Sequence, residues 1–158
     1  MRVKPRLDAA KPITVTGPSM LDLVVLFTSA FLAGTFFPFP SEATLVGLLY
    51  LGRVTSAALW LAATTGNTAG SMVNWLIGRL ALRFRDHPRF PVRADRLARA
   101  QRWFNRFGIW SLLLAWLPLV GTGLAVVAGL MRTPFWLTLL LIGIGKGARY
   151  AVVIGLLP

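Results

Sequence analysis

One carboxylate, Glu42, stands inside a strongly apolar part of the chain, just after Pro38 and Pro40. Each proline removes a backbone hydrogen-bond donor and clashes with the preceding helical turn, so the pair predicts a break in any helix that reaches this point. A break at membrane depth must be buried in protein or line a wet cavity, because lipid offers no hydrogen-bond partners. An ionisable side chain there indicates a functional site. The alternative is an ordinary loop outside the bilayer, with Glu42 in water.

A carboxylate within the membrane needs a cationic partner, because an unpaired charge is costly there. Four basic residues are candidates for pairing with Glu42 or for holding a phosphate group: Arg79, Arg132, Lys146 and Arg149. Lys146 and Arg149 are three residues apart and therefore share a helix face. These two side chains have an alternative interpretation, in which they extend to the membrane surface. The sequence does not choose among the four residues.

The composition of the chain predicts a membrane protein. The chain has 158 residues, of which 56% are hydrophobic and 14% are charged, and its mean hydropathy is +0.67. Three uncharged runs, residues 23–41, 54–78 and 107–131, approach or exceed the ~20 residues that cross a bilayer. We therefore expect an all-α integral membrane protein, with a flexible basic tail over residues 1–19 and a single membrane domain over residues 20–158.

The net charge of +12 and the absence of cysteine narrow the function classes. Arginines gather beside the apolar runs, so membrane topology and anionic lipid explain them better than nucleic acid does. Residues 80–107 form a basic segment that we expect to be cytoplasmic, with an amphipathic helix over residues 94–107 lying on the membrane surface. The single histidine, His87, falls in this segment. With five acids and one histidine, we expect no enzyme, no metal site and no cofactor.

The apolar runs divide into broken and continuous helices. The expected helices cover residues 22–37, 42–52, 55–78 and 133–157. Ser41 is the predicted N-cap of the second of these, which is only about half a span. Pro118 and Gly121 divide the run after residue 107 into two short arms. A short arm after a broken arm is typical of a re-entrant hairpin, so we expect two such hairpins, each followed by a transmembrane helix.

The order of hairpin, arginine and glycine-containing span occurs twice. Pro38 and Pro118 lie 15 and 14 residues before an arginine, and Gly66 and Gly145 lie 13 residues after the same two arginines. Paired broken segments in corresponding positions of two halves indicate an inverted repeat with a transporter-like binding site between the halves.

The first full span carries a row of small and polar residues. Gly66, Gly70 and Asn74 recur every four residues and share one helix face, with Asn67 beside them and Gly78 one turn further on. Small residues let helices approach closely, and asparagine hydrogen-bonds across an interface. We interpret the glycines as a packing face and keep the asparagines as candidates for a polar site.

These motifs resemble those of the DedA, or VTT-domain, membrane proteins. The resemblance to that family's G-x-x-x-G-(x)4-Tyr-x-x-Gly-Arg motif covers Gly66, Gly70, Trp75, Gly78 and Arg79, with tryptophan in place of tyrosine. Pro40-Ser41-Glu42 is similar to the family's Pro-x-Glu in its first re-entrant loop. Residues 116–121, 128–132 (which include Gly129) and 145–150 are similar to the small YqaA-like branch.

The resemblance implies movement of an anionic lipid, a phospholipid or undecaprenyl phosphate, across the bacterial cytoplasmic (inner) membrane by a multi-pass protein. Glu42 would match the family's essential acid and Arg79 its motif arginine. The expected partners are membrane lipids and no nucleic acid; a homo-oligomer stays open. Two other functions also stay open. One is proton- or cation-coupled transport of a small solute, and the other is a non-catalytic membrane scaffold in which Glu42 pairs for folding alone.

Overall fold

The computed structural model describes residues 20–35, 40–81, 99, 102, 104–117 and 120–156. These residues form helices and connecting turns without any strand, which confirms the predicted all-α class. The helices are α1 (Met20–Gly34), α2 (Ser41–Leu51), α3 (Ser56–Ala81), η1 (Gly108–Trp116), α5 (Val120–Leu130) and α6 (Phe135–Gly155). Of these, η1 is a 3₁₀ helix and the others are α-helices.

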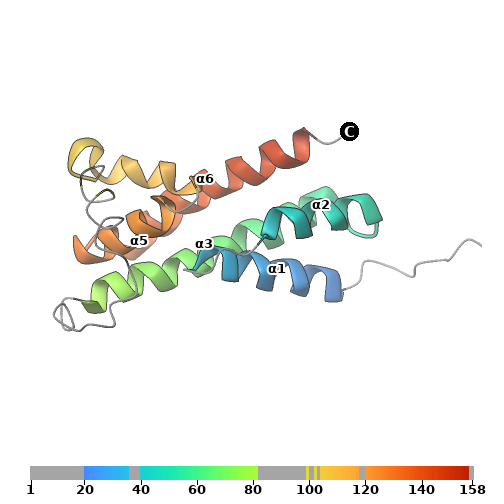
Figure 1. The fold of residues 1–158 in the computed structure, drawn as a ribbon, viewed down its shortest axis with the longest axis horizontal. Coiled ribbons are helices and arrows are strands. Elements are labelled where there is room, and N and C mark those ends of the chain that lie inside the picture. The colour runs from blue at the N-terminus through green and yellow to red at the C-terminus, as the bar shows by residue number, and fades with distance from the viewer. Residues whose placement is uncertain are drawn as a thin grey trace, which may run out of the picture.

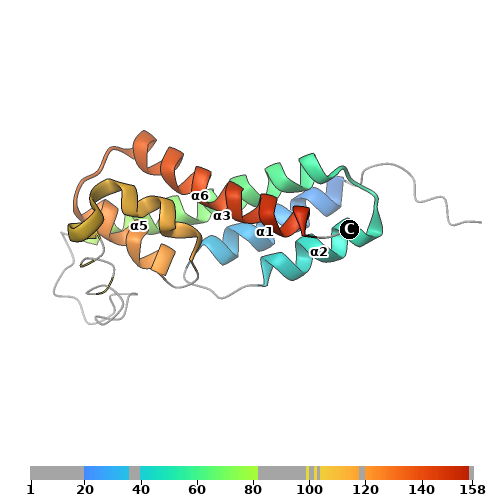
Figure 2. The same ribbon diagram turned by 90° about the horizontal axis from the view of Figure 1, so that it is seen from above.

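The two longest helices, α3 and α6, run side by side through the whole bundle in opposite directions (Figures 1 and 2). Gly143 of α6 lies against Thr68 of α3, and Gly147, one turn later, lies against Trp60. The indole nitrogen of Trp60 donates a hydrogen bond of 2.8 Å to the carbonyl oxygen of Gly147. The pair provides the frame on which the four shorter helices pack.

The first helical hairpin consists of α1 and α2. Phe27 of α1 lies against Gly66 of α3, and the last residue of α1, Gly34, is hydrogen-bonded by Asn74 further along α3. α1 and α3 are therefore parallel, and α1 ends beside the middle of α3. The chain then returns along α2 and turns at Gly52, which has a φ of +62° suited to glycine, before α3 begins.

The second helical hairpin consists of η1 and α5 and occupies the other half of the bundle (Figure 2). Leu113 of η1 lies against Gly145 of α6, and the carbonyl oxygen of Trp116 is hydrogen-bonded by Arg149 one turn later, so η1 runs parallel to α6. The two hairpins thus open toward opposite ends of the α3–α6 pair, and their tips both reach its middle.

Glycines on α3 bring both hairpins into contact with it. A Cβ atom added at Gly70 would collide with the carbonyl oxygen of Phe31 in α1, and one added at Gly78 would collide with that of Val126 in α5. Backbone therefore packs directly against backbone at both points, which only small residues allow.

Each hairpin has its own apolar core. Around the first hairpin, the fully buried side chains include Leu26, Leu45 and Leu59. Around the second, they include Leu112, Leu124 and Ile142. The outer surface is also apolar in many places, and Met20, Trp110, Trp136 and Leu156 are among its exposed side chains. Extensive exposed apolar surface is unusual for a soluble monomer and fits a protein that lies in lipid.

Within the described residues, α6 is the one helix both long enough and apolar enough to cross a bilayer. The predicted span over residues 55–78 is a helix of 26 residues, but its glycines, threonines and asparagines lower its mean hydropathy. The expected helices over residues 22–37, 42–52 and 133–157 correspond to α1, α2 and α6, which begin and end within a few residues of the predicted limits.

One predicted detail is wrong. Ser41 is not the N-cap of α2, because the helix already includes it; Pro40 is the N-cap and makes no side-chain capping bond. Pro38, Pro118, the tail over residues 1–19 and most of the basic segment over residues 80–107 lie outside the described residues.

The glycine contacts predict the outcome of a matched pair of substitutions. Gly70→Ala should destabilise the fold by about 1–3 kcal/mol, because the added methyl group forces α1 and α3 apart. Gly47→Ala, in α2, should be neutral or stabilising by up to about 1 kcal/mol, because nothing lies within 4 Å of the added atom. Thermal unfolding of both variants in detergent micelles checks this. Equal melting temperatures would contradict the proposed backbone contact.

Candidate functional site

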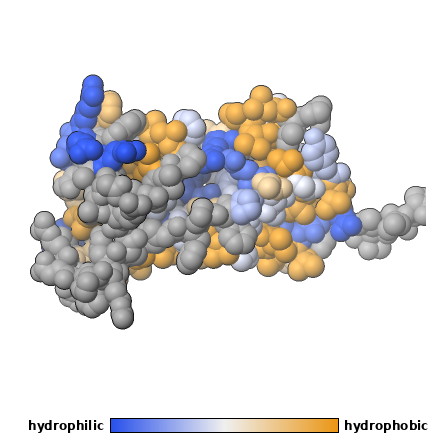
Figure 3. All heavy atoms as spheres, viewed as in Figure 1, coloured by the Kyte–Doolittle hydropathy of each residue, from blue (hydrophilic) through white to orange (hydrophobic). Residues whose placement is uncertain are grey.

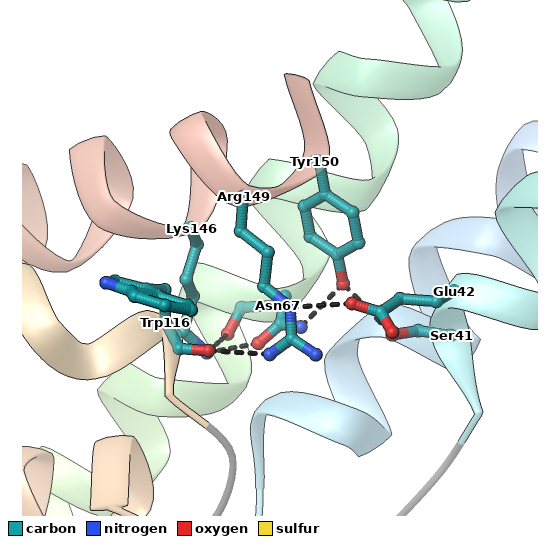
Figure 4. Close-up of polar contacts among 7 residues, drawn as sticks. All are labelled: Ser41, Glu42, Asn67, Trp116, Lys146, Arg149 and Tyr150. Atoms are coloured by element: carbon teal, nitrogen blue, oxygen red, sulfur yellow. Dashed lines mark hydrogen bonds and ion pairs between the residues drawn. The ribbon is translucent and has the colours of Figure 1, made fainter. Parts of the chain in front are cut away.

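Polar groups from four helices meet at the middle of the bundle, where the hairpin tips approach α3 and α6 (Figure 4). The residues of this polar cluster are Ser41 and Glu42 of α2, Asn67 and Ser71 of α3, Trp116 of η1, and Lys146, Arg149 and Tyr150 of α6. The last three share one face of α6, because they are three or four residues apart. α6 therefore contributes a ridge of polar groups to this cluster.

Arg149 connects the tips of the two hairpins. Its Nε donates a hydrogen bond of 2.6 Å to Oε1 of Glu42, in the first turn of α2. Its Nη1 donates another, also of 2.6 Å, to the carbonyl oxygen of Trp116, the last residue of η1. The side chains of Arg149 and Glu42 are 30% and 43% exposed, so the ion pair is open to the surroundings on one side. Glu42 also gains from its place at a helix N-terminus, where the backbone N–H groups favour a negative charge.

Lys146 lies deeper than Arg149. Its side chain is buried, and Nζ donates to the carbonyl oxygen of Asn67 at 3.0 Å, to Oδ1 of the same residue, and to Oγ of Ser71 at 2.6 Å. An ammonium group has three donors and no acceptor, so these three oxygens satisfy it completely. All three are neutral, and no described carboxylate contacts the lysine.

Tyr150 links α6 to α3 and to the first residue of α2. Its hydroxyl oxygen accepts a hydrogen bond of 2.6 Å from Nδ2 of Asn67 and lies 3.0 Å from Oγ of Ser41. The tyrosine is only 1% exposed, so both contacts are shielded from solvent.

The end of α1 is satisfied by α3. The carbonyl oxygen of Gly34 accepts hydrogen bonds from Nδ2 of Asn74 at 2.9 Å and from Oγ of Ser71 at 3.3 Å. The last carbonyl groups of a helix have no partner within the helix. At the end of α1, two side chains of α3 donate the hydrogen bonds that the carbonyl group of Gly34 needs.

Of the four cations considered from the sequence, Arg149 pairs with Glu42, and Lys146 lies one turn away. Arg79 and Arg132 lie elsewhere, at the end of the bundle where α3 finishes and α6 begins. Both are exposed, and the guanidinium group of Arg79 lies 5.7 Å from the centre of the Trp75 ring. Arg132 follows α5 with a φ of +57°, and its backbone N–H closes the helix on Gly129.

On the face drawn in Figure 3, hydrophilic residues gather at the end where α3 finishes, across the middle and at the opposite end. Apolar side chains lie between these places.

The glycines singled out in the sequence act in packing between helices. Added Cβ atoms at Gly66, Gly121 and Gly129 would meet backbone carbonyl oxygens of α1, η1 and α3 respectively. Gly70 and Gly78 make the α1 and α5 contacts described above. Pro40 immediately precedes α2, at the tip of the first hairpin.

Sequence reasoning missed four members of the cluster: Ser41 as a contact of Tyr150, and Ser71, Trp116 and Tyr150 themselves. Two of them had a detectable signal. Ser71 lies four residues after Asn67 and Tyr150 four residues after Lys146, so each shares a helix face with a residue already considered. Trp116 gave no such signal in the sequence, because it takes part in the cluster through its backbone carbonyl group. Among the described residues there is no group of three or more histidine, cysteine, aspartate or glutamate side chains that could hold a metal ion.

Residues 22–157 match the VTT domain, and the chain therefore belongs to the VTT-domain, or DedA, family of membrane proteins, as the sequence motifs predicted. It is 36% identical over 135 residues to inner membrane protein YqaA of Escherichia coli, an alignment that covers 84% of this chain and 89% of that protein. The same values hold for inner membrane protein YqaA of Shigella flexneri. An uncharacterised protein of Haemophilus influenzae is 38% identical over 139 residues, covering 84% of this chain and 85% of its own length. No solved structure matches the chain. The names of the first two relatives support a bacterial inner-membrane location.

The contact between Arg149 and Glu42 predicts energetic coupling. In a double-mutant cycle of Glu42→Gln and Arg149→Met, the effects on the free energy of unfolding should be non-additive by about 0.5–3 kcal/mol, because either change leaves the other group unpaired. Chemical or thermal unfolding in micelles measures the four proteins of the cycle. A control cycle of Glu42→Gln with Arg79→Met should be additive to within about 0.5 kcal/mol, since Arg79 has no contact with the pair. Additivity in the first cycle would contradict the ion pair.

Proposed function

We propose that the protein facilitates movement of an anionic lipid across the bacterial inner membrane, with the headgroup passing Arg149 while the lipid tails stay in the bilayer. The observation that carries this proposal is the Arg149–Glu42 pair. It is the place where both hairpin tips meet, it contains opposite charges at mid-bundle, and it is partly exposed. Because it is partly exposed, the pair can be reached from outside the bundle.

We propose further that both hairpins are re-entrant and that the two halves form an inverted repeat. The opposite openings of the hairpins support this arrangement, and so does one pair of contacts. Gly66 of α3 packs on the α1 backbone at Phe27, and Gly145 of α6 packs on the η1 backbone at Leu113. Each long helix thus contacts the first arm of the hairpin that precedes it through a glycine at the same distance from an arginine.

The charges at the junction favour an anion. Lys146 and Arg149 bring two positive charges against the single negative charge of Glu42. Nη2 of Arg149 has no hydrogen-bond partner among the described residues, whereas Nε and Nη1 have one each. A guanidinium group binds phosphate oxygens through two parallel N–H groups. A phosphate headgroup that took the place of Glu42 would therefore meet a preformed binding group.

The packing of α1 on α3 also indicates which end of the bundle faces the cytoplasm. Because α1 runs parallel to α3 and ends beside its middle, Met20 and Arg79 lie at opposite ends of the molecule. The end that carries Arg79 and Arg132 is the one that positive-inside reasoning places in the cytoplasm. On this proposal, residue 20 faces the other side of the membrane, and α1 is the first arm of a hairpin and not a complete span.

Lipid scrambling by purified protein in proteoliposomes tests the function. We expect the wild-type protein to equilibrate labelled phosphatidylglycerol or undecaprenyl phosphate between leaflets faster than it equilibrates zwitterionic phosphatidylcholine. Arg149→Ala should slow this about tenfold to a hundredfold, because a hydrogen bond to a charged group contributes about 1.5–3 kcal/mol. Gly47→Ala, remote from the junction, serves as the matched control and should keep the wild-type rate.

Each of the other outcomes identifies a different function. Folded wild-type protein that moves none of these lipids would exclude the proposal. Loss of protein abundance in Arg149→Ala and Glu42→Gln, with normal scrambling by the folded fraction, would assign the pair to folding alone. Uptake of a small solute that depends on a proton gradient and on Glu42 would indicate a coupled transporter.

A further inference from the structure

Lys146 sets the direction of the hydrogen bonds that Asn67 makes in the polar cluster. Lys146 can only donate, so Oδ1 of Asn67 is the acceptor that faces it, which fixes the orientation of the asparagine amide. The amide nitrogen must then point the other way, where it donates to the hydroxyl oxygen of Tyr150. The hydroxyl groups of Tyr150 and Ser41 are 3.0 Å apart and share a hydrogen bond in which either can donate. One chain of hydrogen bonds therefore runs from the ammonium group to the first residue of α2.

A second chain leaves the same ammonium group. Nζ of Lys146 donates to Oγ of Ser71, and the hydroxyl group of Ser71 in turn donates to the carbonyl oxygen of Gly34. Gly34 is the last residue of α1. The two chains thus end on either side of the break in the first hairpin, at Gly34 and at Ser41.

We infer that Lys146 is a positioning residue: its buried ammonium group is a built-in cation that orients both sides of the first hairpin's tip and thereby sets Glu42 opposite Arg149. Ser41 is the residue immediately before Glu42, and Lys146 precedes Arg149 by one helical turn, so a shift at either end moves the ion pair directly. Hydrogen bonds in series polarise and strengthen one another, and the charged donor at the start strengthens all of them.

The three oxygens around Nζ all belong to α3. They come from one residue pair on α3, Asn67 and Ser71, and the lysine reaches them from α6. With the cation covalently attached to α6, the tip is held without a dissolved ion. The transport readout of this inference rests on the proposed function, whereas its stability readout does not.

Chemical rescue tests the inference. Lys146→Ala should lower the melting temperature of the protein in micelles and slow lipid scrambling in proteoliposomes. Ethylammonium chloride should restore both toward the wild-type values, because it returns an ammonium group to the vacated space. Sodium chloride at the same ionic strength is the control for salt. Lys146→Met is the control for space: it fills the site with an apolar side chain and should not respond to ethylammonium.

A second measurement covers the case in which Lys146→Ala does not fold. Tyr150→Phe removes one link and leaves the lysine in place. In that background, the coupling between Glu42 and Arg149 should weaken, and Tyr150→Phe should be non-additive with Lys146→Met although the two side chains share no hydrogen bond. Thr138→Val is the matched control. Thr138 bonds Thr133 and the carbonyl oxygen of Pro134 at the other end of α6, so its effect should add to that of Lys146→Met.

The outcomes separate this inference from the proposed function. A lack of rescue by ethylammonium in folded Lys146→Ala, or undiminished Glu42–Arg149 coupling in Tyr150→Phe, would overturn the positioning role. Rescue of the melting temperature in a protein whose wild type moves no lipid would support the positioning role and refute the lipid function alone.

Discussion

The structure depends on one requirement: the polar groups where the two hairpins meet must find partners inside the protein, because a buried polar group without a hydrogen bond is costly. α6 supplies these partners at both tips. Arg149 pairs with the carboxylate in the first hairpin and donates a hydrogen bond to the terminal carbonyl group of η1 in the second. Lys146 donates to Asn67, and Tyr150 is hydrogen-bonded to Asn67 and Ser41. An α6 without these three side chains would leave the Glu42 carboxylate and the carbonyl oxygen of Trp116 without the partners that they have here.

Close helix packing makes these contacts geometrically feasible. Glycines at the crossings of α3 with α1 and α5, such as Gly70 and Gly78, bring backbones together so that short side chains, serine and asparagine, reach across. Packing and polar bonding therefore depend on each other. A larger residue at a crossing would lengthen the hydrogen bonds at the tips, and a lost bond would remove part of what holds the helices in register.

The two cations at the junction have different roles because they are buried to different degrees. Lys146 is enclosed, with every donor satisfied by a neutral oxygen, and is suited to hold structure. Arg149 is partly exposed and keeps an unbonded guanidinium nitrogen among the described contacts, and is suited to exchange Glu42 for a phosphate headgroup. Family membership identifies a membrane protein of the VTT-domain family but leaves its function open, and the partly exposed Arg149–Glu42 pair is the observation from which we propose an anionic lipid.

The sequence by itself determined the all-helical class, the broken and continuous helices, the family, and Glu42 with a short set of cationic partners. These follow from local properties: apolar runs set helix length, proline and glycine set the breaks, and a charge in an apolar run requires a partner. The tertiary structure alone decided which cation is the partner. Arg79 and Arg149 are equally good by composition, but the antiparallel packing of α3 and α6 brings only Arg149 to α2. It also converted Ser41 from an expected N-cap into a contact of Tyr150 and brought in the backbone carbonyl of Trp116, because such pairings join residues more than 30 positions apart, beyond the reach of any local pattern.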